Sequence, residues 1–99
     1  MKYAIAIAES ARTSLQGMDA RWRSTIKTAL QVHLEHEPKK ESRSRIKRLR
    51  GLRQPQYRLR VGEMRVFYDV NDAESRVEVL AFVLKTDAER WLQEQGVPE

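Results

Sequence analysis

Three arginines fall within one short stretch in which apolar and polar side chains alternate. Residues 57–70 have the sequence YRLRVGEMRVFYDV, and this run contains Arg58, Arg60 and Arg65. Arginine keeps its positive charge at any working pH and can bind two phosphate oxygens at once. It can also stabilise the extra negative charge that develops while a phosphodiester is cleaved. Because arginine is a poor general base, such a cleavage would need another group, or an activated substrate hydroxyl, to handle the proton.

The sequence predicts that this stretch is a β-hairpin. Gly62-Glu63 supplies a two-residue turn with glycine first, which suits a type II′ connection. In the resulting register Arg60 faces Arg65, and like charges that face each other cost stability. The three arginines therefore either hold an anion or form a solvated outer face, and the spacing leaves both interpretations open. Alternation sorts the side chains into a core face of Tyr57, Leu59, Val61, Met64, Val66 and Tyr68, and a second face of Arg58, Arg60, Arg65, Phe67 and Asp69.

The positive charge of the chain is concentrated in one segment. The net charge is +5, but residues 39–65 alone hold eleven basic and two acidic residues, a net charge of +9, while the other residues have a net charge of −4. Such asymmetry is typical of a protein that binds a polyanion, most often nucleic acid, or an acidic protein partner. The basic residues of this segment outside the hairpin are Lys39, Lys40, Arg43, Arg45, Lys47, Arg48, Arg50 and Arg53.

Several other classes of chemistry find no support in the sequence. There is no cysteine, no glycine-rich phosphate loop, and neither an HExxH nor a GxSxG motif, so we expect neither a metal site nor a cofactor. His33 and His36 lie three apart on a predicted helix without a third ligand nearby, and Asp69 and Asp72 form only a weak metal motif. Without an apolar run long enough for a membrane span, or a signal-peptide pattern, we expect a cytoplasmic protein.

Apolar periodicity predicts the elements that position the hairpin. In the first part of the chain we expect a strand over residues 2–8 and a short helix over 11–16, capped by Glu9 or Ser10. A longer helix should follow from an N-cap at Asp19 to about Glu37. Residues 39–48 are highly charged, and the sequence does not decide between a loop and a partly formed helix.

The second half of the chain is predicted to be mostly strand. The hairpin strands should span 57–61 and 64–70, and residues 76–84 should form a strand in the middle of the sheet. Thr86 and Glu89 match a capping box at the start of a final helix that runs to Gln95. We therefore expect an α+β fold with two layers, a largely antiparallel sheet and the order β-α-α-β-β-β-α, in one domain over residues 1–99.

Two parts of the sequence resemble the central signature of the RelE/ParE superfamily, the toxins of type II toxin–antitoxin pairs. These parts are Leu49-Arg50-Gly51 and residues 57–70, and the order of elements is similar as well. Membership of the RelE branch would imply a ribosome-dependent endoribonuclease, in which the mRNA 2′-hydroxyl attacks the adjacent phosphate. The resemblance places Arg58, Arg60 and Arg65 at that phosphate as the catalytic residues. It also implies a cognate antitoxin, with the ribosome and mRNA as partners and no small-molecule cofactor.

The sequence departs from the RelE pattern near its C-terminus. Lys85 stands where RelE-type enzymes often have a further arginine, and the final helix has no tyrosine or histidine for proton transfer. Glu63, Asp69 and Tyr68 are the remaining candidates for that role. Two alternatives stay open: a ParE-like inhibitor of DNA gyrase, or a weak toxin that acts mainly in an antitoxin–operator complex. In the endoribonuclease interpretation, Lys85 and the basic residues from 39 to 53 would contact ribosomal RNA.

Overall fold

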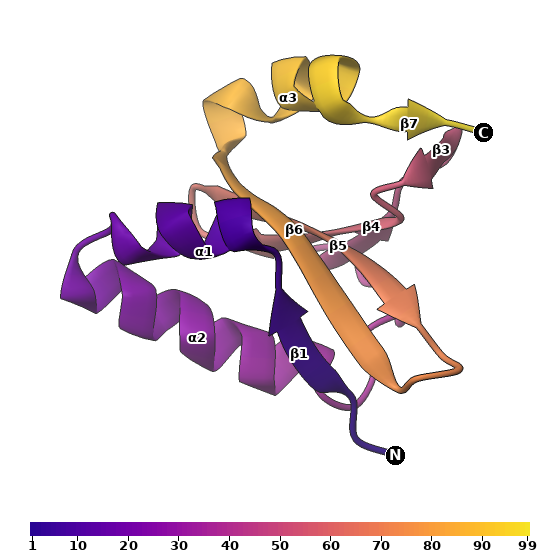
Figure 1. Cartoon of the computed structure of the whole chain (residues 1–99), viewed down its shortest axis with the longest axis horizontal. Coiled ribbons are helices and arrows are strands. Elements are labelled where there is room, and N and C mark those ends of the chain that lie inside the picture. Colours follow the sequence, from indigo (N-terminus) through magenta and orange to yellow (C-terminus); the bar gives the residue numbers. More distant parts are fainter.

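A computed structural model describes residues 1–99 and shows an α+β fold built on one five-stranded sheet. The strand order is β1-β6-β5-β4-β2. Helices α1 and α2 pack on one face of this sheet, and helix α3 covers part of the opposite face (Figure 1). The predicted fold class is confirmed, with α3 as additional cover on the second face.

The N-terminal elements follow the predicted order with small shifts at their ends. They are β1 (Ala4–Ile7), α1 (Glu9–Gln16) and α2 (Ala20–Leu34). Asp19 is the N-cap of α2, since its Oδ1 accepts a hydrogen bond from the Trp22 N–H at 2.9 Å. The predicted caps of α1 are wrong, because Ala8 precedes that helix and no side chain caps it. Helix α2 stops before Glu37 because the Tyr3 N–H binds the Glu35 carbonyl oxygen at 2.7 Å.

The hairpin has the predicted register throughout. Strand β4 (Tyr57–Val61) pairs with β5 (Met64–Asn71) so that Arg60 lies opposite Arg65 and Arg58 opposite Phe67. Gly62 has a φ of 57° while Glu63 has a negative φ, the sign pattern of a type II′ turn. Strand β6 (Arg76–Leu84) lies between β5 and β1, and β1 runs parallel to it.

Residues 39–48 are mainly a loop, one of the two structures that the sequence left open, and contain no helix. Their last part is β2 (Ile46–Arg48), an edge strand that pairs with β4 and places Lys47 opposite Arg58. A second, two-stranded sheet joins β3 (Leu52–Gln54) to β7 (Val97–Pro98) at the C-terminus. These strands are two or three residues long, too short for an alternating pattern to be recognised.

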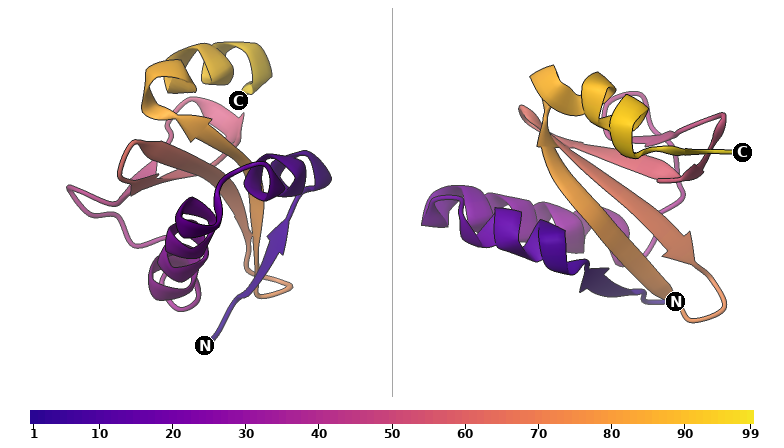
Figure 2. Two further views of the ribbon diagram at one scale, coloured as in Figure 1. Left: turned by 90° about the vertical axis from the view of Figure 1, so that its left-hand side faces the viewer. Right: turned by 45° about the horizontal axis from the view of Figure 1, so that its top comes forward.

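The two faces of the sheet have separate apolar cores. The larger core joins the predicted core face of the hairpin to Leu15 of α1 and to Ile26 and Leu34 of α2. The smaller core lies under α3 (Ala88–Gln95), and Figure 2 shows this helix on the opposite side of the sheet from α1 and α2. In this core the Trp91 ring stacks on the Phe67 ring with 4.9 Å between centroids.

The predicted capping box at the start of α3 is wrong. Thr86 lies inside a short 3-10 helix, η1 (Lys85–Asp87), and Asp87 occupies the N-cap position of α3 without a side-chain hydrogen bond. Helix α3 therefore begins at Ala88, one residue later than a helix with Thr86 as its N-cap would begin.

Candidate functional site

The structure places Arg58, Arg60 and Arg65 together on the sheet face that α3 partly covers. Arg58 and Arg60 are two apart on β4, and Arg65 on β5 lies directly opposite Arg60. Residues two apart on a strand, and residues paired across strands, project from the same face. We call these three residues the arginine cluster.

Arg65 is fixed in position by the turn of the hairpin. Its side chain is buried, and Nη1 donates hydrogen bonds to the carbonyl oxygens of Gly62 at 2.9 Å and Met64 at 3.1 Å. Burial lowers the pKa of Arg65, and the charges of Arg58 and Arg60 lower it further, while Glu63 acts in the opposite direction. A guanidinium held in this way is oriented before any ligand arrives.

Arg58 and Arg60 add positive charge without a counter-ion. The Nε atom of Arg58 is buried and has no hydrogen-bond partner. Burial, followed by the nearby charge of Arg60, lowers the pKa of Arg58. None of the ion pairs in the structure involves a member of the arginine cluster. Buried donors are normally satisfied and close charges are normally paired, so this arrangement suits an anion such as a phosphate group.

Strand β2 brings a further cation to the cluster. Lys47 is exposed and lies opposite Arg58, so both side chains project from the same face. The sequence predicted that Lys47 contacts ribosomal RNA, but it did not predict that Lys47 lies opposite Arg58. A strand of three residues is too short for its register to be recognised from the sequence. Lys85 also lies near the hairpin turn, since its backbone N–H donates to the Glu63 carbonyl oxygen at 2.7 Å.

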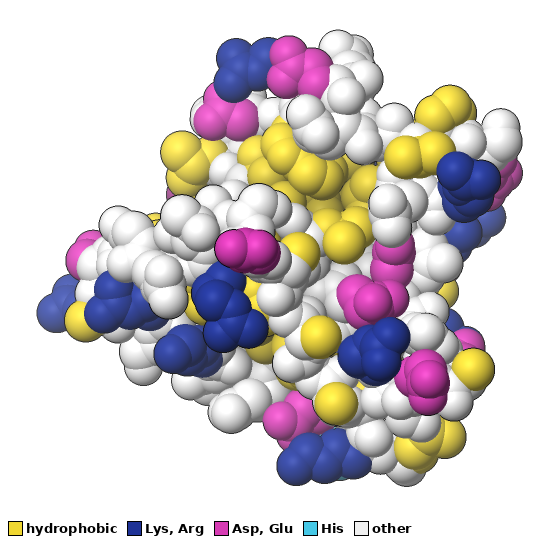
Figure 3. Space-filling view, viewed as in Figure 1, with side chains coloured by type: hydrophobic (Ala, Val, Ile, Leu, Met, Phe, Trp, Pro, Cys, Tyr) yellow, Lys and Arg dark blue, Asp and Glu magenta, His cyan; other side chains and the backbone are white.

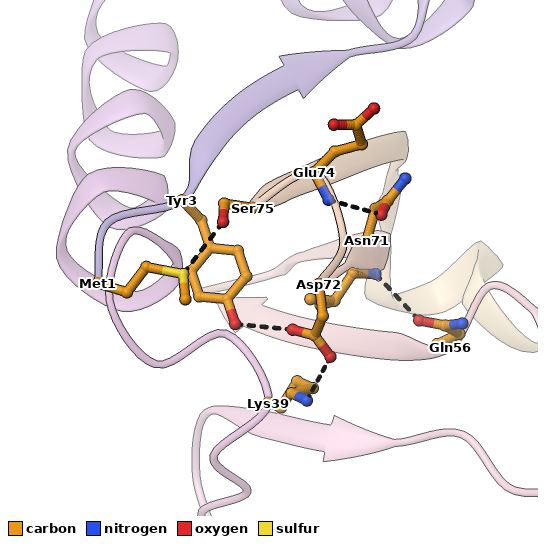
Figure 4. A network of polar contacts seen from close by, with 9 residues as sticks. Met1, Tyr3, Lys39, Gln56, Asn71, Asp72, Glu74 and Ser75 are labelled. Carbon is orange, nitrogen blue, oxygen red and sulfur yellow. Dashed lines mark hydrogen bonds and ion pairs between the residues drawn. The ribbon is translucent and has the colours of Figure 1, made fainter.

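Some of the predicted RNA-binding residues have structural contacts instead of free side chains. Arg48 Nη1 donates to the carbonyl oxygens of Leu49 and Gln56, and its guanidinium lies 5.3 Å from the centroid of the Tyr57 ring. Lys39 forms an ion pair with Asp72 at 2.6 Å (Figure 4). Of the other predicted residues, Arg43, Arg50 and Arg53 are exposed and form no ion pair.

Two of the three candidates for proton transfer are engaged elsewhere. Tyr68 is fully buried on the opposite face, its hydroxyl donates to the Pro38 carbonyl oxygen at 2.7 Å, and burial raises its pKa far above the ordinary value. Asp69 accepts hydrogen bonds from the Gln54 side chain and the Gln56 backbone. Only Glu63, exposed in the turn beside Arg65, remains available.

The acidic pair considered in the sequence also has a structural use. Asp72 accepts hydrogen bonds from the Tyr3 hydroxyl at 2.7 Å and from Lys39 at 2.6 Å, so it joins the N-terminus, the β5–β6 turn and the chain after α2 (Figure 4). These two donors lower the pKa of Asp72. The structure brings together no three His, Asp or Glu side chains that could hold a metal ion.

A hollow of roughly 580 Å³ lies between α1 and α3, apart from the arginine cluster. Its floor is formed by residues 80–84 of β6 and one wall by Trp91. Figure 3 shows hydrophobic side chains gathered in this hollow. None of the helices is both long and apolar enough to cross a lipid bilayer.

Comparisons with solved structures identify proteins that share this fold. No family model matches the sequence, and no curated protein is similar enough to match. Among solved structures, the chain is similar to a mutant of the E. coli toxin RelE in the free state, with a TM-score of 0.70 and 25% identity over 95% of this chain and 94% of that one. It is also similar to an archaeal RelE–RelB complex from Pyrococcus horikoshii OT3, with a TM-score of 0.70 and 24% identity over 86% of this chain and 97% of that one.

A third similar structure is the toxin–antitoxin complex RelBE2 from Mycobacterium tuberculosis, with a TM-score of 0.65 and 22% identity over 85% of this chain and 99% of that one. Of these three structures, one is a free RelE toxin and two are complexes of the toxin–antitoxin type. The resemblance predicted from the sequence is therefore confirmed: the chain has the fold of the RelE-like toxin superfamily.

Proposed function

We propose that this protein is the toxin of a type II toxin–antitoxin pair and that it cleaves mRNA on the ribosome. The observation that carries the proposal is the arginine cluster: three guanidinium groups without a counter-ion, on a fold shared with RelE toxins. A binding face that is strongly positive and already oriented suits the phosphate backbone of RNA.

The geometry suggests a division of roles during cleavage. The mRNA 2′-hydroxyl would attack the adjacent phosphate and form a 2′,3′-cyclic phosphate, while the P–O5′ bond breaks and the leaving 5′-oxygen takes a proton from water. The nucleophile therefore comes from the RNA, and this step uses no cofactor. Arg65, fixed by the hairpin turn, would bind the phosphate as it gains negative charge. Arg58 and Arg60 would hold the neighbouring oxygens, and Glu63 is the one candidate to accept the proton from the hydroxyl.

The remaining exposed cations would hold the protein on the ribosome. Seven basic residues outside the arginine cluster are exposed and would contact ribosomal RNA: Lys40, Arg43, Arg45, Lys47, Arg50, Arg53 and Lys85. This role requires the protein to work in the cytoplasm, as one domain spanning residues 1–99. Lys39 and Arg48 would contribute less, because their charged groups already have partners within the chain.

An antitoxin would control the activity by covering the arginine cluster. Two of the similar solved structures are toxins bound to antitoxins of the RelB type. An acidic segment of such a partner would neutralise the region with a net charge of +9 and exclude RNA from it.

One observation favours a second candidate function. Helix α3 has the sequence AERWLQEQ, which contains neither tyrosine nor histidine, so it offers no residue for the proton-transfer role common in RelE-type enzymes. A protein with this fold could instead inhibit DNA gyrase without cutting RNA, as ParE toxins do. A third interpretation is a weak toxin that acts mainly with its antitoxin on an operator.

Induced expression of the chain alone tests these functions. Growth and the 5′ ends of cellular mRNA would be compared for the wild type, Arg65→Ala and the exposed variant Arg60→Gln. Arg12→Gln, in an exposed residue of α1 that forms no ion pair, is the matched control. Circular dichroism of each purified variant would show whether it is folded.

The endoribonuclease proposal predicts growth arrest with new cuts inside translated reading frames. Both should be lost in Arg65→Ala, weakened in Arg60→Gln and kept in Arg12→Gln. Arrest without cuts would contradict the nuclease and favour gyrase as the target. The absence of arrest would favour a role confined to the antitoxin complex.

A further inference from the structure

Both histidines of the chain lie in one small pocket beside the β2 edge of the sheet. The pocket has a volume of roughly 220 Å³ and lies between the C-terminal end of α2 and the start of β2. Its charged and polar lining residues are His33, His36, Glu37, Lys40, Ser42 and Arg45. All of the lining residues lie between positions 32 and 46, where the chain turns back from α2 to β2. The sequence predicted both histidines on one helix, but His36 lies just after the end of α2 at Leu34.

The polar groups of this pocket are mostly unused hydrogen-bond donors. Ser42 Oγ accepts hydrogen bonds from the backbone N–H groups of Arg45 at 3.1 Å and Ile46 at 3.3 Å, which leaves its own O–H free to donate. Neither histidine ring forms a hydrogen bond within the chain, and Arg45 uses only Nη1. The pocket therefore has more donors than acceptors, since Glu37 is the one carboxylate that lines it.

The electrostatic balance of the pocket is positive. Glu37 is its one carboxylate, and it lies 3.6 Å from Lys40 in an exposed pair. Burial lowers the pKa of His33, and the charge of Arg45 lowers it further. The pocket thus contains two fixed cations, one fixed anion and two histidines that can add charge, which suits a small anion and not a cation.

Arg45 connects this pocket to the arginine cluster. Its Nη1 donates to the Arg60 carbonyl oxygen at 3.2 Å, and its own carbonyl oxygen accepts from the Arg60 N–H at 2.9 Å. The pocket and the cluster therefore lie on neighbouring segments, joined at the edge of the sheet. A single-stranded chain of phosphates that crosses this edge would meet both.

We propose that the pocket formed by His33, His36, Lys40, Ser42 and Arg45 is a second phosphate-binding site, which holds an RNA phosphodiester beside the one held by the arginine cluster. The inference rests on the proposed RNA-binding function and adds a site to it. It assigns a ligand to both histidines, which the cleavage chemistry leaves unused.

The proposal has a consequence for pH dependence. A bound phosphate favours the protonated histidine, so RNA binding should take up protons and become tighter as the pH falls. The charged groups that face the histidines are Glu37, Lys40 and Arg45. The chain has no other histidine, but an α-amino group also titrates near this range, so a variant without the two histidines is needed to identify the part that comes from the pocket.

Fluorescence polarisation with a labelled oligothymidylate tests the site directly. This probe has no 2′-hydroxyl to start cleavage, and its bases do not titrate in this range. For the wild type we expect binding roughly three- to tenfold tighter at about pH 5.5 than at about pH 7.5, since one unit of pKa shift corresponds to a factor of ten. The double variant His33→Gln/His36→Gln should bind with nearly the same affinity at both pH values.

Controls separate this proposal from the proposed function. Arg21→Gln changes an exposed charge of α2 outside the pocket and should keep the full pH dependence. Arg60→Gln should weaken binding at both pH values and keep the ratio between them. A wild type without pH dependence, or a double variant that keeps it, would overturn the pocket while leaving the arginine cluster intact.

A second measurement covers the case in which the oligonucleotide does not bind. The ring protons of both histidines would be followed by NMR while inorganic phosphate is added to the wild type. A raised pKa for His33 and His36 in phosphate, absent in a chloride control, would support the pocket even if the RNA-binding function failed. Identical titrations in phosphate and chloride would count against it.

Discussion

Neutralising Arg60 should make the protein more stable and bind RNA less tightly. The reason is the geometry of the arginine cluster, in which Arg60 lies directly opposite Arg65 with no carboxylate in an ion pair with either. If the two arginines repel each other in the free protein and bind an anion together, neutralising one of them should raise the stability of the protein and lower its affinity for RNA. Arg60→Gln is suitable because the side chain is exposed and glutamine keeps most of its aliphatic stem.

The expected size follows from the position of the pair. Like charges directly opposite each other on neighbouring strands cost roughly 0.2–1 kcal/mol, and exposure of Arg60 to solvent places this pair in the middle of that range or below it. We expect Arg60→Gln to raise the free energy of unfolding by about 0.5 kcal/mol at low salt. In a domain of this size that corresponds to an increase of about 2–4 °C in Tm.

Thermal unfolding at low and high salt is the assay. Because salt screens repulsion between exposed charges, the wild type should gain stability as salt is added and the variant should gain less. In oligonucleotide binding, the dependence of log affinity on log salt should become shallower by about 0.7 for the lost phosphate contact. Arg21→Gln, which removes an exposed charge of α2 outside any ion pair, is the control. A variant that is no more stable than the wild type at low salt, with an unchanged control, would refute the repulsion.

Three further substitutions test other parts of the structure. Trp91→Ala removes the ring stacked on Phe67 and should lower the free energy of unfolding in urea by about 2–3 kcal/mol, whereas Trp91→Phe should retain most of the stability. Gly62→Ala puts a side chain where φ is 57° and its Cβ would lie 3.4 Å from Trp22, so we expect a loss of about 1–2 kcal/mol, and an unchanged urea midpoint would contradict the turn geometry. Asp72→Asn should lower Tm at neutral pH. In the folded protein the pKa of Asp72 lies below its ordinary value of 3.8. The stability that the Asp72 carboxylate contributes is therefore present above pH 3.8 and is lost as the pH falls through the pKa of the folded state. The Tm values of the variant and the wild type should converge in acid.

The hairpin could be predicted from the sequence because its information is local. Gly62-Glu63 defines the turn, and the alternation on either side then fixes which residue faces which. The sequence could therefore place the arginine cluster on one face. It could not show that Arg65 is buried and bonded to the turn, because the burial depends on distant segments such as β6, which places Val83 beside Arg65.

The parts that could not be predicted depend on contacts between distant segments. Strand β2 exists because Ile46 fills a core position opposite Leu59, and only the finished hairpin offers that edge. Helix α2 ends early because the backbone of Tyr3 binds its last turn. The capping box failed for a related reason: the Lys85 N–H binds the Glu63 carbonyl oxygen, which fixes the backbone just before Thr86.

The same distinction separates the two candidate anion sites. The arginine cluster belongs to one hairpin, so it can form as soon as β4 and β5 pair. The histidine pocket needs the C-terminal end of α2 and the edge strand β2 to be in place, and these meet only in the complete fold. Ile46→Ala should weaken β2 without changing any side chain that we propose to bind phosphate. This variant should therefore lose the pH dependence of RNA binding but keep most of its affinity at neutral pH. Equal loss of both would show that the two sites depend on the same structure.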